Sequence, residues 1–252
     1  MRLLYIMFFS AILFCACDDN LPKHYQLEVL AEYPHDVNSY TQGLFFHKGQ
    51  MYETTGLRGK STLRIVDIET GDALRKINFD KKYFIEGSVV LNENLYILTW
   101  DSKSIFVYGA DSLDYRATWK YPREGWGLTT DTKYLYASDG SSTIYVLDEK
   151  LSLQRRISVK NQERPVRWLN ELEFIDGKIW ANVYTTDDIV IINPKDGRVE
   201  GIIDCRGLLP QNLRTDDTDV LNGIAYNPKT KKIFLTGKNW PRMYEVKLVE
   251  IK

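Results

Sequence analysis

The chain has 252 residues, of which 44% are hydrophobic and 27% charged, and its formal net charge is −1. This composition is typical of a globular protein and is sufficient for one large domain or two small ones. No stretch gathers Lys and Arg on one face, so a nucleic-acid partner has little support and we expect none. The chain carries 16 Tyr, 10 Phe and 6 Trp, and it lacks long helical periodicity. These features favour an all-β chain of many short strands.

The first residues predict an export signal. Arg2 precedes an apolar run over residues 3–13, which is too short to span a bilayer and has the form of a signal-peptide core. The small residue Ala16 then stands directly before Cys17, as at a bacterial lipoprotein processing site. The segment therefore indicates an exported protein whose first mature residue is a lipidated cysteine.

This interpretation divides the N-terminal region into a signal and a tether. We expect residues 1–16 to be removed, Cys17 to carry the lipid, and residues 17–23 to link it to the folded body. The protein is then a periplasmic or outer-membrane-anchored lipoprotein that meets the membrane through its lipid alone. A plain secreted protein cut nearby is the alternative, because Phe14 stands where an aliphatic residue is usual.

Cys205 is the one thiol that remains beyond the processed end. A single thiol cannot form an internal disulfide, so the core must hold the fold together. No His is near it in the sequence, and the preceding residues 202–204 have the pattern of a strand. We expect a buried, inert cysteine rather than a catalytic one.

The body of the chain is built from five similar units. Each unit starts with a polar or aromatic residue at the entry to a short apolar strand, and the spacings between starts are 44, 40, 44 and 52 residues. A period in the low forties suits the four-stranded blade of a β-propeller. The unit starts are Gln42, Glu86, Trp126, Asn170 and Asn222.

Within a unit, a polar turn follows the first strand, and two or three further strands rich in β-branched and aromatic residues follow the turn. The fifth unit is one strand short, ending near residues 244–248. We expect residues 25–30 to supply the missing strand, because an N-terminal strand that completes the last blade leaves no open edge. The prediction is an all-β, five-bladed β-propeller over residues 24–252, present as a monomer.

The repeats also predict a site. The second strand of a blade runs antiparallel to the first, so residues just before strand one and just after strand two emerge at the same face. The five unit starts form one ring, and a second ring follows the second strands at Gly56, Trp100, Gly140, Tyr184 and Lys238. A concave, aromatic-walled opening with a few converging polar groups is the expected form of a small-ligand site.

Each of these residues also has a purely structural interpretation. An isolated Gln or Asn before a strand is most often a turn residue, and a Trp in a propeller is most often part of the core. A lone lysine such as Lys238 is equally compatible with a solvated loop charge. The argument for a site rests on the register, which brings the residues together without assuming a function.

Blocks of sequence in all five units resemble the signature blocks of the glutaminyl-peptide cyclotransferases of the plant and bacterial type. The blocks keep their order and cover nearly the whole mature chain. They are Tyr40-Thr41-Gln42-Gly43-Leu44, Phe84-Ile85-Glu86-Gly87, Leu98-Thr99-Trp100, Gly125-Trp126-Gly127-Leu128-Thr129, Leu169-Asn170-Glu171-Leu172-Glu173, Trp180-Ala181-Asn182-Val183, Val220-Leu221-Asn222-Gly223-Ile224-Ala225 and Thr236-Gly237-Lys238-Asn239-Trp240-Pro241.

The resemblance implies a five-bladed propeller that cyclises the N-terminal glutamine of peptides or proteins to pyroglutamate and releases ammonia. It implies Glu86 as the catalytic acid/base and Lys238 as an active-site lysine. Tyr184 stands where plant members carry Trp, and Tyr40 where Phe is usual; both keep a ring. The substrate-binding residues it implies are Gln42, Asn170, Tyr40, Phe84, Trp100, Trp126 and Tyr184, and the register adds Asn222 to the expected substrate-binding residues.

The chemistry leaves the protonation state of Glu86 open. Burial among apolar residues favours the neutral carboxyl group, whereas Lys238 favours the anion or acts on the oxyanion instead. The scheme needs no metal and no cofactor. His24, His35 and His47 have no zinc-site spacing, and the aspartates at positions 216, 217 and 219 lack an EF-hand pattern.

Two alternatives from other classes remain open at this point. A propeller can bind exported peptides or glycans without chemistry, which needs neither the acid Glu86 nor the base Lys238. A propeller lactonase or another hydrolase with a channel metal needs several carboxylates in the inner ring, where Glu86 is the one present.

Overall fold

The structure is a computed structural model that describes residues 21–251. Its regular structure is β throughout, apart from one short 3-10 turn, η1 (Gln211–Leu213). The predicted signal peptide over 1–16 and the lipidation of Cys17 lie outside the described residues. Among the residues described, no helix is long and apolar enough to cross a membrane.

Three four-stranded antiparallel sheets follow one another along the chain. Each is a simple meander, in which strands adjacent in sequence pair with one another. Their strands are β2 (Thr41–His47), β3 (Gln50–Thr55), β4 (Thr62–Val66) and β5 (Ala73–Asn78); β6 (Ile85–Leu91), β7 (Asn94–Thr99), β8 (Ser104–Gly109) and β9 (Tyr115–Lys120); and β10 (Leu128–Thr130), β11 (Leu135–Ala137), β12 (Thr143–Leu147) and β13 (Leu153–Ser158).

The remaining long strands form one eight-stranded sheet in the order β16-β17-β18-β19-β1-β22-β21-β20. Each half is again a four-stranded unit, and the halves meet where β1 runs parallel to β19 over Lys23–Gln26. The strands are β1 (Lys23–Pro34), β16 (Leu169–Ile175), β17 (Lys178–Val183), β18 (Asp188–Ile192), β19 (Val199–Asp204), β20 (Leu221–Asn227), β21 (Lys232–Gly237) and β22 (Arg242–Ile251).

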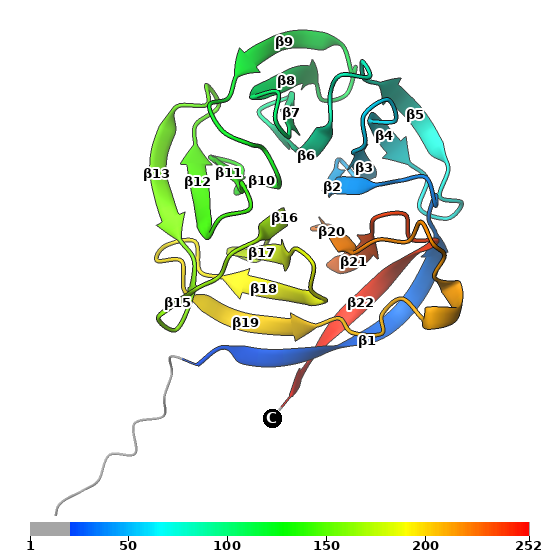
Figure 1. The fold of residues 1–252 in the computed structure, drawn as a ribbon, viewed down its shortest axis with the longest axis vertical. Coiled ribbons are helices and arrows are strands. Elements are labelled where there is room, and N and C mark those ends of the chain that lie inside the picture. The colour runs from blue at the N-terminus through cyan, green and yellow to red at the C-terminus, as the bar shows by residue number, and fades with distance from the viewer. Residues whose placement is uncertain (1–20, 252) are drawn as a thin grey trace, which may run out of the picture.

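The N-terminal strand does complete the last unit. β1 pairs antiparallel with β22 from His24↔Ile251 to Pro34↔Arg242. Figure 1 shows the two strands side by side at the periphery of the molecule. The prediction that the N-terminal segment fills the missing place in the C-terminal unit is therefore confirmed, and the strand is longer than the six residues expected.

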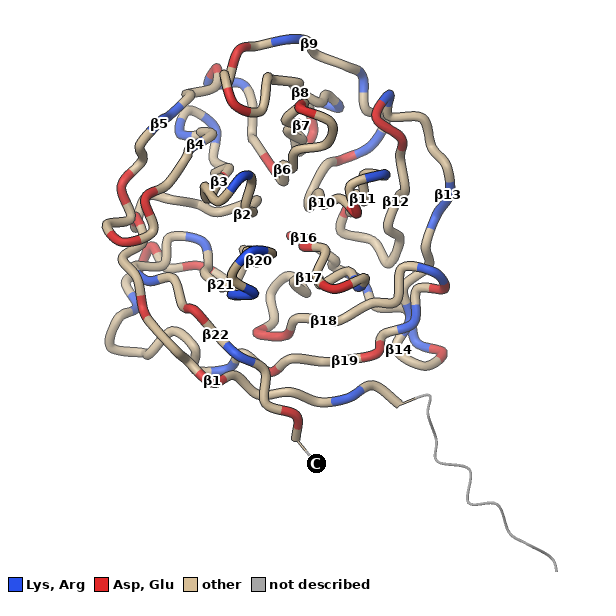
Figure 2. The backbone as a smooth tube through the Cα atoms, turned by 180° about the vertical axis from the view of Figure 1, so that it is seen from behind, with Lys and Arg blue, Asp and Glu red and all other residues tan. Residues whose placement is uncertain are grey.

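The units are arranged in a ring, with their first strands nearest the centre (Figure 1). These strands contact one another in a closed order, β2 to β6 to β10 to β16 to β20 and back to β2. The arrangement is all-β and consistent with a propeller. Seen from behind, basic and acidic residues are interspersed around the ring (Figure 2).

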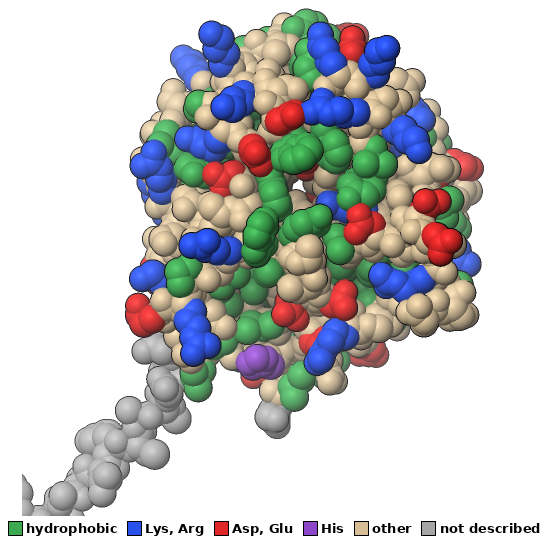
Figure 3. All heavy atoms as spheres, in the orientation of Figure 1, with side chains coloured by type: hydrophobic (Ala, Val, Ile, Leu, Met, Phe, Trp, Pro, Cys, Tyr) green, Lys and Arg blue, Asp and Glu red, His purple; other side chains and the backbone are tan. Residues whose placement is uncertain are grey.

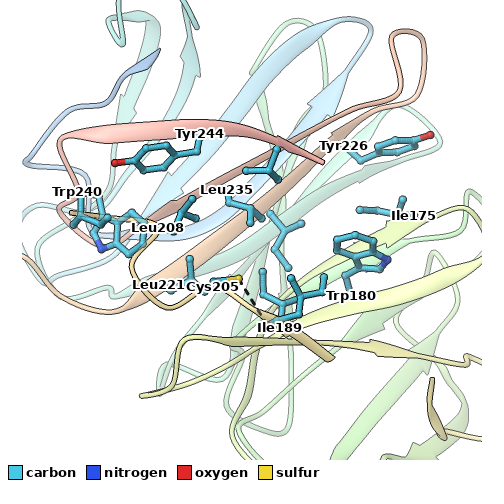
Figure 4. Packing of buried hydrophobic residues seen from close by; sticks show 14 residues of the cluster. Ile175, Trp180, Ile189, Cys205, Leu208, Leu221, Tyr226, Leu235, Trp240 and Tyr244 are labelled. Atoms are coloured by element: carbon cyan, nitrogen blue, oxygen red, sulfur yellow. Dashed lines mark hydrogen bonds between the residues drawn. The ribbon is translucent and has the colours of Figure 1, made fainter. Parts of the chain in front are cut away.

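The core lies between neighbouring sheets, because each sheet presents apolar side chains to the next. One cluster between the two halves of the eight-stranded sheet includes Trp180, Leu235, Trp240 and Cys205 (Figure 4). Cys205 lies just after β19, is 4% exposed, and burial raises the pKa of its thiol. The prediction of a buried cysteine is confirmed.

Two elements escaped the sequence patterns. A small hairpin of β14 (Lys160–Asn161) and β15 (Arg164–Pro165) precedes the fourth unit, and η1 precedes the fifth. Both are too short to show a period. Four of the five first strands also begin differently from the prediction, which has consequences for the site.

Candidate active site

A cavity of about 350 Å³ lies in the ring of first strands. Its volume is within the range of small-ligand sites. Seven of the lining residues were predicted from the register, Tyr40 and Phe84 were implied by the resemblance, and the tenth, Trp168, was missed. The lining consists of Tyr40, Gln42, Phe84, Glu86, Trp100, Trp126, Trp168, Asn170, Tyr184 and Lys238.

Four of the five unit starts lie inside the first strands and not before them as predicted, whereas Trp126 does precede its strand. Gln42, Glu86, Asn170 and Asn222 are each the second residue of their strand, while Trp126 precedes β10 by two residues. In those four strands the pairing with the second strand shifts at this residue, as in a β-bulge. A bulge bends the strand and re-aims a side chain. The sequence did not reveal the bulges, because they do not disturb the apolar pattern.

Neighbouring sheets are joined at the level of the bulges. Thr54 Oγ1 donates a hydrogen bond to the carbonyl oxygen of Glu86 at 2.7 Å, and Gly87 N donates to the carbonyl oxygen of Trp126 at 2.7 Å. A Cβ on Gly87 would lie 2.6 Å from Leu128 N, so only glycine fits this close approach. The backbone on both sides of Glu86 is therefore held by adjacent strands.

The second predicted ring follows the ends of the second strands. Trp100, Tyr184 and Lys238 come directly after β7, β17 and β21. The two glycines of this ring leave room for aromatic walls: a Cβ on Gly56 would lie 2.7 Å from Phe84 Cζ, and one on Gly140 would lie 2.7 Å from Trp126 Cζ2.

Glu86 is buried, with 5% of its surface exposed. Burial raises the pKa of its carboxyl group well above the ordinary value, Lys238 opposes that shift, and Glu124 adds to it. Among the described residues, Glu86 is the only carboxylate that lines the cavity. Desolvation therefore outweighs the lysine in shifting the pKa of this group.

Lys238 is also buried, at 3% exposed, and burial lowers the pKa of its amine while Glu86 and Asp219 oppose the change. Its Nζ lies 4.8 Å from the ring centroid of Tyr40 and 4.9 Å from that of Tyr184. Two aromatic faces can stabilise the cationic form where carboxylate contact is lacking.

Tyr40 explains one of the aspartates that the sequence left without a role. Its hydroxyl donates a 2.6 Å hydrogen bond to Asp219 Oδ2, and its ring packs edge-on against Phe84 at 6.2 Å between centroids. Burial and the Asp219 carboxylate raise the pKa of the Tyr40 phenol. The hydroxyl that distinguishes Tyr from Phe here anchors the ring that faces Lys238.

Glu124 was not predicted, yet it orients two walls of the cavity. Its Oε2 accepts hydrogen bonds from Trp100 Nε1 at 3.0 Å and from Trp126 Nε1 at 3.2 Å. One carboxylate thereby fixes the rotation of both indoles. The only signal in the sequence was its position two residues before Trp126.

The polar residues of the cavity differ in their partners. Asn170 Oδ1 is buried and has no hydrogen-bond partner within residues 21–251. Gln42 Oε1 accepts from Asn222 Nδ2 at 3.2 Å, which leaves the NH₂ end of Gln42 to face the cavity. Asn222 does not line the cavity; it is fully buried and also donates to the carbonyl oxygen of Thr41 at 2.9 Å. A role for Asn222 in substrate binding therefore acts through Gln42.

Two further carboxyl groups are buried on β16. Glu171 Oε2 accepts from Ile224 N at 3.0 Å, and Glu173 Oε1 accepts from Tyr226 N at 2.9 Å. Burial raises the pKa of both groups, that of Glu173 to about 8. These carboxyl groups accept hydrogen bonds from main-chain N–H groups of the neighbouring first strand, and they do not line the cavity.

In the part of the chain that the structure describes, no group of three or more His, Cys, Asp or Glu could hold a metal ion.

Comparison with known proteins relates this geometry to a family. The family model for glutamine cyclotransferase matches residues 3–248. The chain is 41% identical over 230 residues to the glutaminyl-peptide cyclotransferase of Arabidopsis thaliana, covering 88% of this chain and 71% of that protein.

Solved structures give the same relation. The glutaminyl cyclase of Myxococcus xanthus superimposes with a TM-score of 0.85 at 34% identity, covering 92% of this chain and all of that one. A streptogramin B lyase shares the fold alone, with a TM-score of 0.52 at 9% identity over 89% of this chain and 98% of that one. The family match, the sequence identity and the superposition together show that this chain belongs to the glutamine cyclotransferase family.

Proposed function

We propose that the protein is a glutaminyl-peptide cyclotransferase that converts the N-terminal glutamine of peptides or proteins to pyroglutamate and releases ammonia. The observation that carries the proposal is a buried carboxyl group of raised pKa, Glu86, in a cavity with aromatic walls. The family membership points to the same reaction.

The reaction needs one group that moves a proton between two nitrogens. The uncharged α-amine attacks the Cδ carbon of the substrate's side-chain amide, a C–N bond forms, and the carbonyl oxygen becomes an oxyanion. Glu86 as carboxylate takes the proton that the attacking nitrogen must lose. It then gives that proton to the amide nitrogen, which leaves as ammonia when the old C–N bond breaks. A raised pKa suits a group that alternates between base and acid near neutral pH.

The oxyanion needs donors that are already in place. Lys238 and Gln42 both line the cavity, and because the oxygen of the Gln42 amide already accepts from Asn222, its NH₂ group is the end that can donate. As a buried cation and a neutral donor, they stabilise developing negative charge more strongly than water does. The unpartnered Oδ1 of Asn170 is an acceptor, and it suits the N–H groups of the substrate's amine or amide.

The aromatic walls hold the substrate in its folded-back form. Phe84 packs edge-on against Trp100 at 5.5 Å between centroids, and Trp126 packs edge-on against Tyr184 at 5.6 Å. Rigid apolar walls exclude water and keep the amine near the amide carbon, which lowers the entropic cost of ring closure.

The direct test is mass spectrometry of the purified protein incubated with a Gln-initiated peptide, with and without a chelator. We expect a loss of about 17 Da, the mass of ammonia, that is insensitive to the chelator; as a control, the same peptide with N-terminal Asn should react far less, because its side chain is one carbon too short for the favoured ring. Binding without mass loss would instead indicate a non-catalytic peptide-binding propeller. Activity that the chelator abolishes would refute a metal-free mechanism.

We further infer a set of finer properties. Counting each half of the eight-stranded sheet as one blade makes the ring a five-bladed propeller, which the closed contact order of the first strands supports.

The enzyme belongs to the aminoacyltransferases, acts without a metal, and is a monomer. The N-terminal sequence supports a signal peptide over 1–16, lipidation of Cys17 and a periplasmic or outer-membrane location. Labelling with a palmitate analogue in wild type and in Cys17→Ser tests the lipid anchor.

A further inference from the structure

Trp168 lines the mouth of the cavity with a large part of its ring uncovered. Its side chain belongs to the cavity wall, yet the residue is 55% exposed. In the space-filling view, hydrophobic side chains surround a hollow at the centre of the ring (Figure 3). Single exposed apolar residues are common on protein surfaces. This one differs from a scattered surface residue because it also lines the cavity.

The backbone of Trp168 has a φ of 65°, in the left-handed region, which thirteen other non-glycine residues within residues 21–251 also adopt. Two hydrogen bonds hold it there: Trp168 N donates to the carbonyl oxygen of Gly140 at 2.8 Å, and Tyr184 N donates to the carbonyl oxygen of Trp168 at 2.8 Å. A backbone in this region persists when its surroundings over-determine it. A glycine would satisfy this conformation without strain, so the indole itself calls for a reason.

The ring continues the aromatic wall outward from the buried chemistry. The Trp168 centroid lies 6.2 Å from that of Trp126, with the planes inclined by 36°. Trp100, which Glu124 links to Trp126, is itself 40% exposed. The wall therefore runs from the buried Glu86 to an exposed edge made of indoles, beside the carboxylate of Glu124.

The chemistry of the substrate determines which part of the peptide lies against these exposed indoles. Cyclisation uses the amine and the side chain of the first residue, so both must lie inside the cavity. The rest of the peptide, beginning with the second residue, can leave only through the mouth. Its first side chain therefore passes the uncovered face of an indole.

We propose that Trp168 forms a subsite for the side chain of the second residue of the substrate, and that this subsite favours aromatic and large apolar residues. Stacking on the indole provides the preference, and the Glu124 carboxylate disfavours an acidic second residue. The proposal rests on the proposed function, because it names the substrate class of the same site.

The test compares kcat/KM for three tripeptides, Gln-Phe-Ala, Gln-Gly-Ala and Gln-Asp-Ala, in wild type and Trp168→Ala. We expect wild type to prefer the Phe peptide to the Gly peptide. In Trp168→Ala that preference falls by about 2- to 12-fold, which is the contribution of an aromatic pair beyond its buried area. The loss is expected mainly in KM, because the subsite contacts ground state and transition state alike.

Three further variants separate recognition from structure. Trp168→Phe keeps a ring and should retain most of the preference, whereas Trp168→Leu fills the space without a ring and should lose it. Tyr115→Ala removes a 59% exposed ring on the outer strand β9 and should leave the preference unchanged. Thermal melts of all four variants establish that the folded protein is compared.

The outcomes distinguish the two proposals. Turnover of all three peptides with no preference in wild type, or with the wild-type preference retained in both Trp168→Leu and Trp168→Ala, overturns the subsite. No turnover of any peptide by wild type refutes the proposed function instead.

Discussion

Replacing the buried acid with its amide, Glu86→Gln, is the sharpest perturbation of the proposed mechanism. The amide has nearly the same shape, so the packing against the aromatic walls is kept while the proton transfer is lost. Because one carboxyl group serves both the attacking and the leaving nitrogen, and no other carboxylate of the described residues lines the cavity, no neighbour can replace it. General acid–base catalysis contributes about 10²- to 10⁴-fold, or ~3–5 kcal/mol of activation free energy. We expect a loss of kcat toward the upper end of that range.

The same variant should not lose stability. The pKa of Glu86 is raised in the folded protein, so the folded state keeps its proton at a pH where the unfolded chain, with a pKa of about 4.3, has released it. Stability from this group is therefore fully present below that pH and declines as the pH rises toward the folded pKa. The amide of Gln has no such decline. At pH 8 the variant should melt at the same temperature as wild type or higher, and the difference should shrink toward pH 4.

The assay is release of ammonia from a Gln-initiated peptide, measured with thermal melts at pH 4 and pH 8. Glu163→Gln is the matched control, since the side chain of Glu163 is 95% exposed, and it should leave both measurements unchanged. A folded Glu86→Gln protein with more than a tenth of wild-type kcat would refute the reasoning.

The other predictions concern the groups around the acid. Lys238→Arg keeps a cation whose pKa exceeds 12. If Lys238 acts as a cation, its lowered pKa causes kcat to fall at alkaline pH, and in the Arg variant this fall should move to higher pH. An unchanged fall of kcat at alkaline pH would contradict that role. Glu124→Gln removes the charge that helps to raise the pKa of Glu86, so the acidic limb of the pH profile of kcat should shift to lower pH. KM should rise about 3- to 10-fold, because the two indoles lose a charged hydrogen-bond acceptor. An unmoved acidic limb would show that the two carboxyl groups are not coupled. Gly56→Ala should displace the Phe84 ring and raise KM several-fold. The overpacking should also lower the free energy of unfolding by about 1–3 kcal/mol. A crystal structure of the variant with the Phe84 ring in place would disprove this account.

Much of the site could be predicted because the repeats make register visible. Placing Glu86 and Lys238 in one cavity needed only the knowledge that strand one and strand two of a blade run antiparallel. Residues outside that register were harder to see. Trp168 lies two residues before the start of its unit, and nothing in the local pattern shows that its backbone turns the ring into the mouth.

The residues that orient the side chains of the cavity could not be predicted from the sequence, for a related reason. Glu124, Asp219 and Asn222 act through side-chain hydrogen bonds to a Trp, a Tyr and a Gln that are contributed by other strands or by their own loop. Such contacts depend on the distances between blades, which a period in the sequence does not contain. The aspartate at 219 therefore looked like a loop residue, and Asn222 like an equal member of the inner ring.

The sequence by itself determined the strand content, the order of the units, the completing role of the N-terminal strand and most of the residues that line the cavity. It could do so because apolar alternation and a period in the low forties are local properties of the chain. Only the tertiary structure decided the bulges that aim Gln42, Glu86 and Asn170, and the balance between burial and Lys238 that raises the pKa of Glu86. Desolvation depends on what every neighbouring strand covers, so packing rather than sequence neighbours decided the direction in which the pKa of this acid shifts.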